Sequence, residues 1–444
     1  MTDYGTRVIE GIKARDPQQK EFIQAVTEML DSLSPMLQAH PEYERMAILE
    51  RLTEPERAIM FKVPLETDDG RLEVYRGYRV QFNSAIGPYK GGLRLHPSVN
   101  LSIMKFLGFE QIFKNALTTL PIGGAKGGSD FDPKTHSEAE VRRFCASFMT
   151  ELYRHIGPDT DVPAGDMGVG GREIGYLYGQ YRRLVGHSEP GVLTGKGLTF
   201  GGSLARTEAT GFGLVYFLQE VLKQHPIANP RLIISGSGNV AIYAAVKAQQ
   251  CGYTVVAMSD SKGYITDPQL DVATVRKIKE QMRKGLDLYP QMAGHGTYHA
   301  GSVYDAVIPC DVVLPCGTQN EIDAARARNI AADGARIVAE GANMPDNNDA
   351  IAFYRQQGMI FVPGKAANAG GVATSALEMT QNSQRLSWTF DQVDAKLHGI
   401  MQDIHGQCQK ACAEYGLAPD DYVAGANIAG AGKVITAMIA QGLY

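Results

Sequence analysis

Lysines lie in or beside glycine-rich segments at two places in the first half of the chain, and a third lies on a predicted helix. Lys126 stands in the run PIGGAKGGSD and Lys90 in GPYKGGLR, while Lys114 follows Gln111 by three residues in FEQIFKNAL. Glycine leaves the backbone without a side-chain wall, so a ligand can approach both the chain and an ammonium group. On a helix, Gln111 and Lys114 share one face. These lysines predict a pocket for an anion with more than one carboxylate, in which like charges lower a lysine pKa. A solvated loop around Lys126 and an ion pair of Lys114 with Glu110 are the alternatives.

A dinucleotide fingerprint lies in the second half of the chain, in the run GSGNVA that starts at Gly236. It follows the strand-like run RLIIS and precedes the small-residue helix VAIYAAVKAQQ. Gly236 permits the tight turn, Gly238 lets a pyrophosphate approach the backbone, and Ala241 allows close packing of helix on strand. Strand, fingerprint, helix and second strand in one unit predict dinucleotide binding. The candidate residues are Gly236, Ser237, Gly238, Asn239 and Val240.

The second strand of this unit, TVVAMS, ends in the loop SDSKG, where the adenosine ribose of a dinucleotide is expected. Asp260 alone favours NAD, because a carboxylate there accepts a hydrogen bond from the 2′-hydroxyl. Ser261 and Lys262, together with Ser237, are donors suited to a 2′-phosphate, and Arg283 is a further candidate. We therefore expect NADP, with NAD as the alternative. The other interpretation is that these are ordinary polar loop residues.

Further candidates lie in glycine-rich loops. Asp166, in PAGDMGVGG, can act as a general acid and base, since a carboxylate beside lysines and a nicotinamide can transfer protons at the carbon that receives hydride. Three later loops, EGANMP among them, follow strand candidates, and ligands of open α/β sheets bind beyond the carboxyl ends of strands. Asn343 is thus a candidate for substrate and cofactor, Asn368 for cofactor and Ser375 for substrate. Loop capping by Asp166 and turn geometry for the others are the alternatives.

The elements that position these residues differ between the two halves of the chain. Residues 8–52 carry apolar side chains at helical spacing and predict an N-terminal helical arm. Residues 59–83 predict a β-hairpin that turns at DDG. Ser98 or Asn100 caps a predicted helix that runs to about Thr119.

From about residue 201 short buried strands alternate with helices, and the strand candidates are RLIIS, TVVAMS, DVVLPC, RIVAEG and MIFVP. This alternation predicts parallel strands covered by helices, the doubly wound arrangement. We therefore predict an α/β fold with two domains separated by a cleft: an α/β substrate-binding domain and a Rossmann-type cofactor domain. The expected boundaries are 1–200 for the substrate-binding and oligomerisation domain, 201–424 for the cofactor domain and 425–444 for a C-terminal helix.

Composition excludes several classes of protein. With 444 residues, 44% of them hydrophobic, the chain is long enough for two folded domains. The net charge of -5 is spread along the chain, which argues against nucleic acid as a partner and in favour of a small charged ligand. The N-terminus has no apolar run of signal-peptide length, and we expect no membrane span. The six cysteines form no CxxC pair, so we expect reduced thiols, a cytoplasmic protein and no bound metal.

Six motifs, GPYKGGLR, PIGGAKGG, PAGDMGVGG, GSGNVA, EGANMP and GKAANAGGVATS, follow one another in this order. In this set the chain resembles the hexameric glutamate dehydrogenases of the Glu/Leu/Phe/Val dehydrogenase family, over roughly residues 20–440. The resemblance implies that Lys126 polarises the substrate carbonyl and helps to activate water, with Asp166 as its partner in proton transfer. It implies further that Lys114 and Gln111 hold the α-carboxylate.

By the same resemblance, Lys90 holds the distal carboxylate, with help from Ser375 of the second domain. Thr210 and Asn239 match positions near the nicotinamide carboxamide, and the C-terminal helix, from about Ala426, returns to the first domain. The implied reaction is the reversible conversion of 2-oxoglutarate, ammonia and NADPH to glutamate and NADP. The implied assembly is a homohexamer.

Three competing functions remain. Dehydrogenases of apolar amino acids share several of these motifs, but their substrates have no distal carboxylate for Lys90, and a buried cation facing an apolar side chain is costly. A catalytically silent NADP-binding regulator predicts a broken catalytic pair, whereas Lys126 and Asp166 are both present. A P-loop phosphotransferase requires the spacing GxxxxGK[ST], which GGAKGGSD lacks.

Overall fold

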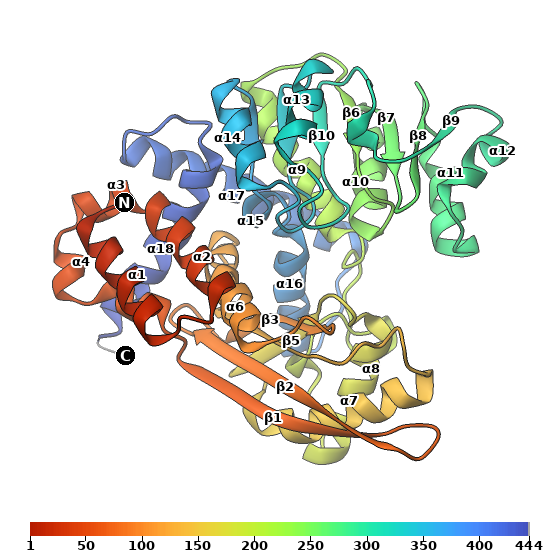
Figure 1. Ribbon diagram of the computed structural model, residues 1–444. Helices are drawn as coiled ribbons and strands as arrows, with labels where there is room; N and C mark the ends of the chain where they lie inside the picture. The colour runs from red at the N-terminus through yellow and green to blue at the C-terminus, as the bar shows by residue number, and fades with distance from the viewer. Residues whose placement is uncertain (443–444) are drawn as a thin grey trace. The chain divides into compact units, whose positions relative to one another are not determined.

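The structure is a computed structural model that describes residues 1–442 (Figure 1). It contains two compact units. The first comprises Met1–Leu204, Val372–Val393 and the residues from Asn427 on; the second comprises Ala205–Gly371 and Asp394–Ala426. Residues 372–393, which we expected in the second domain, thus group with the first unit.

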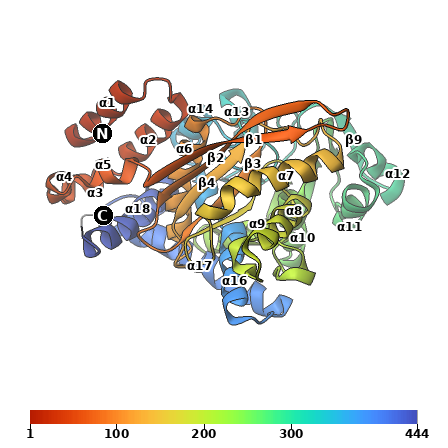
Figure 2. The same ribbon diagram turned by 90° about the horizontal axis from the view of Figure 1, so that it is seen from below.

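Unit 1 begins with a cluster of helices, drawn in red in Figure 2. Their bounds are α1 (Asp3–Arg15), α2 (Lys20–Ser32), α3 (Ser34–Ala39), α4 (Glu42–Arg45) and α5 (Ile48–Thr53). The helical arm expected over residues 8–52 is therefore confirmed, as five short helices. The Thr2 side chain caps α1 by accepting a hydrogen bond from the Gly5 N–H at 3.1 Å. Ala47 adopts left-handed backbone angles, φ 49°, and separates α4 from α5.

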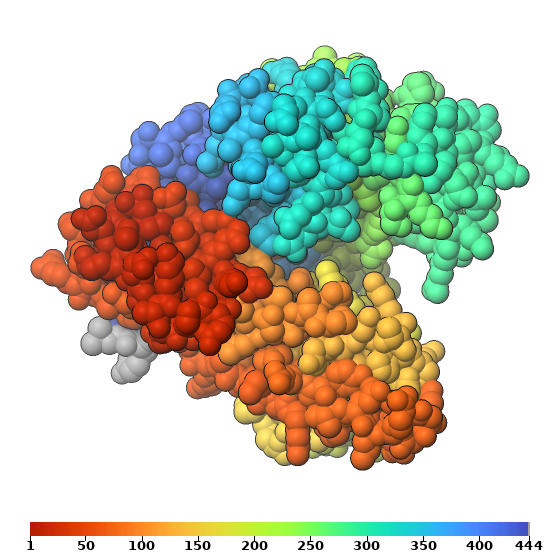
Figure 3. All heavy atoms as spheres, viewed as in Figure 1, coloured from red at the N-terminus to blue at the C-terminus, as the bar shows by residue number. Residues whose placement is uncertain are grey.

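The sheet of unit 1 has five strands in the order β1-β2-β4-β3-β5. Their bounds are β1 (Arg57–Glu66), β2 (Leu72–Asn83), β3 (Tyr89–Leu95), β4 (Gly124–Ser129) and β5 (Asp161–Gly165). The expected hairpin is confirmed, because β1 pairs with β2 in antiparallel register. β3 runs parallel to both β4 and β5. The hairpin, in orange, lies on the face of the molecule drawn in Figure 3.

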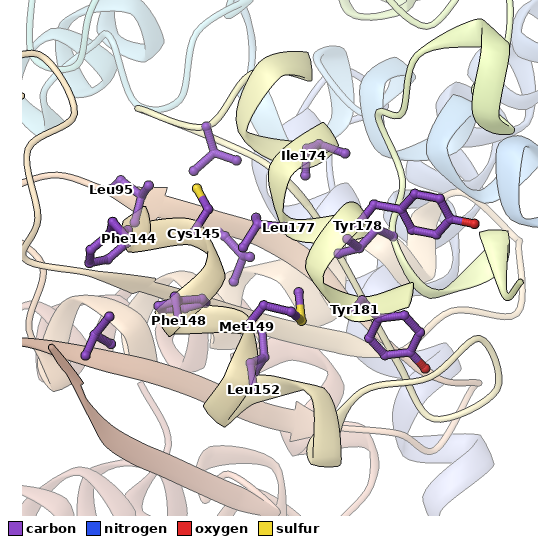
Figure 4. Close-up of a cluster of buried hydrophobic side chains, with 14 of the residues drawn as sticks. Leu95, Phe144, Cys145, Phe148, Met149, Leu152, Ile174, Leu177, Tyr178 and Tyr181 are labelled. Carbon is purple, nitrogen blue, oxygen red and sulfur yellow. The ribbon is translucent and has the colours of Figure 1, made fainter. Parts of the chain in front are cut away.

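Helices cover both faces of this sheet. α6 (Leu101–Leu117) packs on β2 and β4, and Asn100, rather than Ser98, caps it by accepting from the Ile103 N–H. On the other face, α7 (Glu138–Leu152) and α8 (Gly171–Val185) pack against each other. Figure 4 shows the buried cluster that joins these two helices to the sheet, with Leu95 from β3 among the aromatic and aliphatic side chains. The apolar faces of α7 and α8 thereby fix one side of β3.

Unit 2 contains a sheet of seven strands in the order β12-β11-β10-β6-β7-β8-β9. The strands from β12 to β7 are parallel, as the alternation of strands and helices predicted. β8 and β9 are antiparallel additions that the sequence reading missed. The bounds are β6 (Arg231–Ile234), β7 (Thr254–Ser259), β8 (Gly263–Thr266), β9 (Thr297–Ala300), β10 (Val312–Leu314), β11 (Ile337–Ala339) and β12 (Ile360–Val362).

Chain order reverses in this sheet between β6 and β10, which is the position at which doubly wound sheets bind their ligands. The helices that connect or flank the strands are α9 (Ala209–Gln224), α10 (Asn239–Gln250), α11 (Val272–Arg276), α12 (Tyr289–Ala293), α13 (Ala324–Ala332), α14 (Asn348–Gln356) and α15 (Gly364–Ala367). Three further helices follow: α16 (Gly370–Gln384), α17 (Phe390–Glu414) and α18 (Tyr422–Ala440).

Within the described residues, α18 is the one helix long and apolar enough to cross a membrane by length and composition. The expectation that no segment reaches this length is therefore wrong. From Asn427 on this helix belongs to unit 1: Asn427 donates to the Ser32 hydroxyl at 2.8 Å, and Lys433 donates to the Ala116 carbonyl at 3.3 Å. More than half of its apolar window, 56%, is buried inside the protein.

Candidate active site

Lys90 and Lys126 stand on neighbouring parallel strands, not on turns. A solvated loop was the alternative interpretation of PIGGAKGGSD, and it is wrong, because residues Gly124–Ser129 form β4, buried between β2 and β3. The glycines serve a close approach: a Cβ at Gly124 would lie 2.6 Å from the Cγ1 of Ile112 on α6. A residue with a side chain would push α6 off the sheet. Lys126 is thereby held on a rigid strand directly under α6.

Lys126, Asp166 and Arg94 form a buried cluster at the end of this sheet. The Lys126 Nζ lies 3.1 Å from the Asp166 Oδ2, and the Arg94 Nε donates to the same oxygen at 2.9 Å. The three side chains are only 7%, 18% and 13% exposed. One carboxylate therefore bridges two cations, and the cluster carries a net positive charge.

Strand register explains how these side chains meet. Leu93 pairs with Gly127 of β4 and with Gly165 of β5, so Gly92 lies beside Lys126 and Arg94 beside Asp166. A Cβ at Gly92 would lie 2.8 Å from the Cβ of Asp166. Glycine at this position leaves the space in which Asp166 reaches Lys126 across β3.

The pKa values of both Lys126 and Asp166 are lowered within the cluster. Burial lowers the pKa of Lys126; the Asp166 carboxylate opposes this effect and the charge of Arg94 adds to it. Burial raises the pKa of Asp166, but the charges of Lys126 and Arg94 outweigh burial and lower it to about 2. Asp166 is therefore ionised near neutral pH, and the ammonium of Lys126 loses its proton more readily than an exposed lysine does.

Lys90, on β3, is buried and held by hydrogen bonds to β5 and to a loop of unit 1. Its Nζ donates to the Val162 carbonyl at 3.0 Å and to the Thr194 hydroxyl at 2.8 Å, and the residue is 1% exposed. Asn115 of α6 donates to the Lys90 carbonyl at 3.0 Å and accepts from Gln111 at 2.7 Å. The structure thus connects Gln111 to the backbone of Lys90 through Asn115.

Lys114 lies on the same helix as Gln111 and is half-buried. Ser375, on α16, is buried at 1% exposure and belongs to unit 1, the unit that also holds Lys90. We expected Ser375 to come from the second domain. The compact units place it with Lys90, Gln111 and Lys114, whereas Asn343 lies in unit 2.

The glycine fingerprint forms the turn between β6 and α10 in unit 2. Gly236 has φ 83°, and a Cβ there would lie 2.9 Å from the Cys316 carbonyl, which follows β10. The turn therefore lies at the point where chain order reverses. Gly238 is the N-cap of α10, carries no side-chain cap and has open space at its Cβ position. The first N–H groups of α10 are thus available to a diphosphate, and the residues present fit a dinucleotide.

Asp260 has both carboxylate oxygens engaged by its own unit. Oδ1 accepts from the N–H groups of Lys262 at 3.0 Å and Gly263 at 3.2 Å. Oδ2 accepts from the Leu286 N–H at 2.9 Å and lies 3.4 Å from the Lys279 Nζ. The negative charge that would repel a 2′-phosphate is compensated by these groups. Asp260 therefore does not by itself select NAD.

The remaining cofactor candidates differ in how deeply they are buried. Ser261, Lys262 and Arg283 are exposed, and Ser237 is half-buried in the glycine turn. Asn368 is buried, and its Nδ2 donates to the Asn343 Oδ1 at 2.9 Å and to the Ala342 carbonyl at 3.1 Å. The half-buried Thr210 of α9 lies beside Gly371, where a Cβ would be 2.6 Å from its hydroxyl. These residues all belong to unit 2.

Two polar contacts were missed from the sequence. Arg94 stands in GPYKGGLR, four residues after Lys90, and an even spacing on a strand places both side chains on one face. That spacing could have identified Arg94. Thr194 carries no comparable signal, because only the fold brings its hydroxyl to Lys90.

Within residues 1–442, no group of three or more His, Cys, Asp or Glu side chains is arranged to hold a metal ion. The six cysteines are free thiols. The groups that can carry chemistry in unit 1 are therefore the ammonium, guanidinium and carboxylate groups described above.

Comparison with known proteins identifies the family of this chain. A family model described as Glutamate/Leucine/Phenylalanine/Valine dehydrogenase matches residues 201–442, and one described as Glu/Leu/Phe/Val dehydrogenase, dimerisation domain, matches residues 55–183. The NADP-specific glutamate dehydrogenase of Salmonella typhimurium is 56% identical over 441 residues, 97% of this chain and 97% of that protein. The NAD-specific glutamate dehydrogenase of Clostridium symbiosum is 52% identical and covers 100% of both chains. The crystal structure of Plasmodium falciparum glutamate dehydrogenase matches with a TM-score of 0.96 and 49% identity, over 99% of this chain and 94% of that chain. The chain therefore belongs to the Glu/Leu/Phe/Val dehydrogenase family.

Proposed function

We propose that this protein catalyses the reversible reductive amination of 2-oxoglutarate by ammonia and NADPH, giving L-glutamate, NADP and water. The observation that carries the proposal is the buried Lys126–Asp166–Arg94 cluster, with Lys90 held separately on the next strand. One cationic centre suits the reacting carbonyl and its carboxylate, and the second suits a distal carboxylate. The relatives above, more than half identical over the whole chain, carry the same activity in their names.

The substrate residues divide between its two ends. Lys114 and Gln111 of α6 bind the α-carboxylate, which brings the neighbouring carbonyl to Lys126. Lys90 binds the distal carboxylate, together with Ser375. Lys90 is buried and already donates to the Thr194 hydroxyl at 2.8 Å, which supports this role, because a preorganised ammonium loses little entropy when a carboxylate binds.

Lys126 and Asp166 move the protons. The ammonium of Lys126 polarises the carbonyl while ammonia attacks, and Asp166 exchanges protons with the nitrogen as water leaves. NADPH, when bound, supplies the hydride that reduces the resulting carbon. In the direction of glutamate oxidation Lys126 starts neutral and accepts a proton from the attacking water. The lowered pKa of Lys126 supports this role.

The cofactor is NADP, with NAD as a second possibility. Gly236, Gly238 and the first turn of α10, including Asn239 and Val240, hold the diphosphate. Ser237, Ser261 and Lys262 bind the 2′-phosphate, while Asp260 is compensated by Lys279. Thr210, Asn343 and Asn368 orient the nicotinamide end. The relatives include both NADP-specific and NAD-specific enzymes, so NAD is kept as the second possibility.

The protein assembles with copies of itself, and we infer a homohexamer in the cytoplasm. The hairpin β1–β2 exposes three apolar side chains, Met60 at 67%, Leu72 at 77% and Val74 at 70%. Met60 lies on the edge strand β1, and Leu72 and Val74 lie on the part of β2 that pairs with β1 alone; exposed apolar residues there are suited to an interface. They lie within the segment that matches the family's dimerisation domain. The buried, free cysteines Cys145, Cys310 and Cys316 fit a reducing compartment.

The test follows the absorbance of reduced nicotinamide in a mixture of purified protein, 2-oxoglutarate and ammonium. We expect NADPH to be oxidised faster than NADH, and Lys126→Ala to abolish the reaction. Lys13→Ala, an exposed lysine of α1, is the matched control and keeps full activity. Activity in Lys126→Ala would refute the catalytic assignment, and a preference for NADH would refute the assignment of the 2′-phosphate residues. Inactivity of the wild type with both cofactors would favour the silent regulator.

A further inference from the structure

A buried ion pair joins α16 to the segment that carries Thr194. The Lys196 Nζ lies 2.6 Å from the Glu378 Oε1, and both side chains are fully inaccessible to solvent. Lys196 also donates to the Leu193 carbonyl and, at 3.0 Å, to the Asn382 Oδ1. All three donors of this ammonium group are therefore used.

The carboxylate of Glu378 is equally well bonded. Its Oε2 accepts from the Gly195 N–H at 3.0 Å, and its Oε1 accepts also from the Lys196 N–H at 3.4 Å. One turn further along α16, Asn382 donates to the Gly201 carbonyl at 2.7 Å. The helix thus holds the loop at both ends, with the ion pair at its centre.

The ion pair lies next to Thr194 and Ser375, two residues that we place near the distal carboxylate of the substrate. Thr194 lies between two residues bonded to the pair, Leu193 and Gly195, and its hydroxyl accepts from Lys90 at 2.8 Å. Ser375 precedes Glu378 by three residues, so both side chains project from one face of α16. A change in the spacing of Lys196 and Glu378 would move Thr194 relative to Ser375.

A role in stability alone does not account for this pair. Apolar residues of similar volume often replace a buried ion pair without loss of stability, because desolvation offsets the attraction. What apolar side chains cannot reproduce is a fixed register set by directional hydrogen bonds. We propose that Lys196 and Glu378 are positioning residues. They fix the distance from Ser375 to Thr194, whose hydroxyl is bonded to Lys90, and so select the chain length of the dicarboxylate substrate. This inference rests on the proposed function, in which that pocket holds the distal carboxylate.

The deciding variant is Lys196→Met/Glu378→Leu, which removes both charges and leaves neither one buried alone. We measure kcat and KM with 2-oxoglutarate, and compare kcat/KM with the four-carbon and six-carbon analogues, oxaloacetate and 2-oxoadipate. One methylene group in a pocket is worth about 10- to 200-fold in kcat/KM. We expect KM for 2-oxoglutarate to rise about tenfold, kcat to change little, and the preference for five carbons to fall by about tenfold or more.

The control is Lys247→Met/Asp394→Asn, which removes an ion pair of 3.5 Å within unit 2. We expect this variant to keep the wild-type KM for 2-oxoglutarate and the wild-type chain-length preference. An unaltered chain-length preference in a folded Lys196→Met/Glu378→Leu enzyme overturns the inference. Should that protein fail to fold, Glu378→Gln, which keeps the size of the side chain, decides in the same way. Wild-type inactivity towards 2-oxoglutarate would instead contradict the proposed function, so the two failures are distinct.

Discussion

The charge of Arg94 adds to burial in lowering the pKa of Lys126, and Arg94→Met tests this contribution directly. Both side chains bind the same oxygen of Asp166, at 2.9 and 3.1 Å, so their nitrogens lie within about 6 Å of each other. At an effective dielectric constant of about 20, two unit charges at that distance repel by about 3 kcal/mol. Removal of the guanidinium therefore raises the pKa of Lys126, because the charge of Arg94 is one of the causes that lower it.

The assay is the pH dependence of kcat/KM for glutamate oxidation, in which Lys126 has to start neutral. Its pKa appears as the acid limb of the profile. In Arg94→Met this limb moves to higher pH, because the pKa of Lys126 rises when the neighbouring charge is removed. In Arg94→Lys, which keeps the charge, it moves much less. An acid limb that stays in place, or moves to lower pH, in Arg94→Met would show that the charge of Arg94 does not control Lys126.

Three further perturbations follow from the same structure. Gly92→Ala places a methyl group 2.8 Å from the Cβ of Asp166 and lowers kcat by about 100-fold, since displacement of a catalytic group by about 1 Å has that effect; an unchanged kcat in steady-state assays would contradict the register argument. Lys90→Leu leaves the Thr194 hydroxyl without its donor and removes the cation for the distal carboxylate, so kcat/KM for 2-oxoglutarate falls by about 10⁴-fold. Glutamate turnover at the wild-type level in that variant would instead favour an apolar amino acid as substrate. Burial raises the pKa of Asp346 from 3.8 to about 7, so the folded state binds a proton that the unfolded state releases, and stability falls as pH rises through this range. Asp346→Asn removes this loss, and thermal melting across the range checks it; parallel curves for variant and wild type would be the contrary result.

Elements with strong local signals were predictable. The hairpin β1–β2 follows from two strand-like runs around DDG, and α6 follows from a helical pattern after Asn100. The five parallel strands of unit 2 follow from short apolar runs between helices. β8 and β9 were missed, because four-residue strands such as GYIT and TYHA carry too short a pattern to distinguish them from loops.

β4 was not predicted as a strand because glycine is ambiguous. A run such as GGAKGGS has the composition of a turn, and only the neighbouring strands and α6 make it a strand. The candidate site shows the same division. Lys126, Asp166 and Lys90 were identified from their motifs, whereas Thr194 was not, because its role depends on a contact across 104 positions of the chain.

The sequence by itself determined which chemical groups this protein has: the lysines and the aspartate in their glycine-rich motifs, the dinucleotide turn, and the family to which such a set belongs. These are local properties, since they depend on residue types and on spacing along one strand, turn or helix. The tertiary structure alone decided how the groups act on one another. Arg94 joins Lys126 through one oxygen of Asp166, and Lys196 fixes α16 through Glu378. Burial and charge separation arise only when distant segments pack, and they set the pKa values and distances on which the chemistry depends.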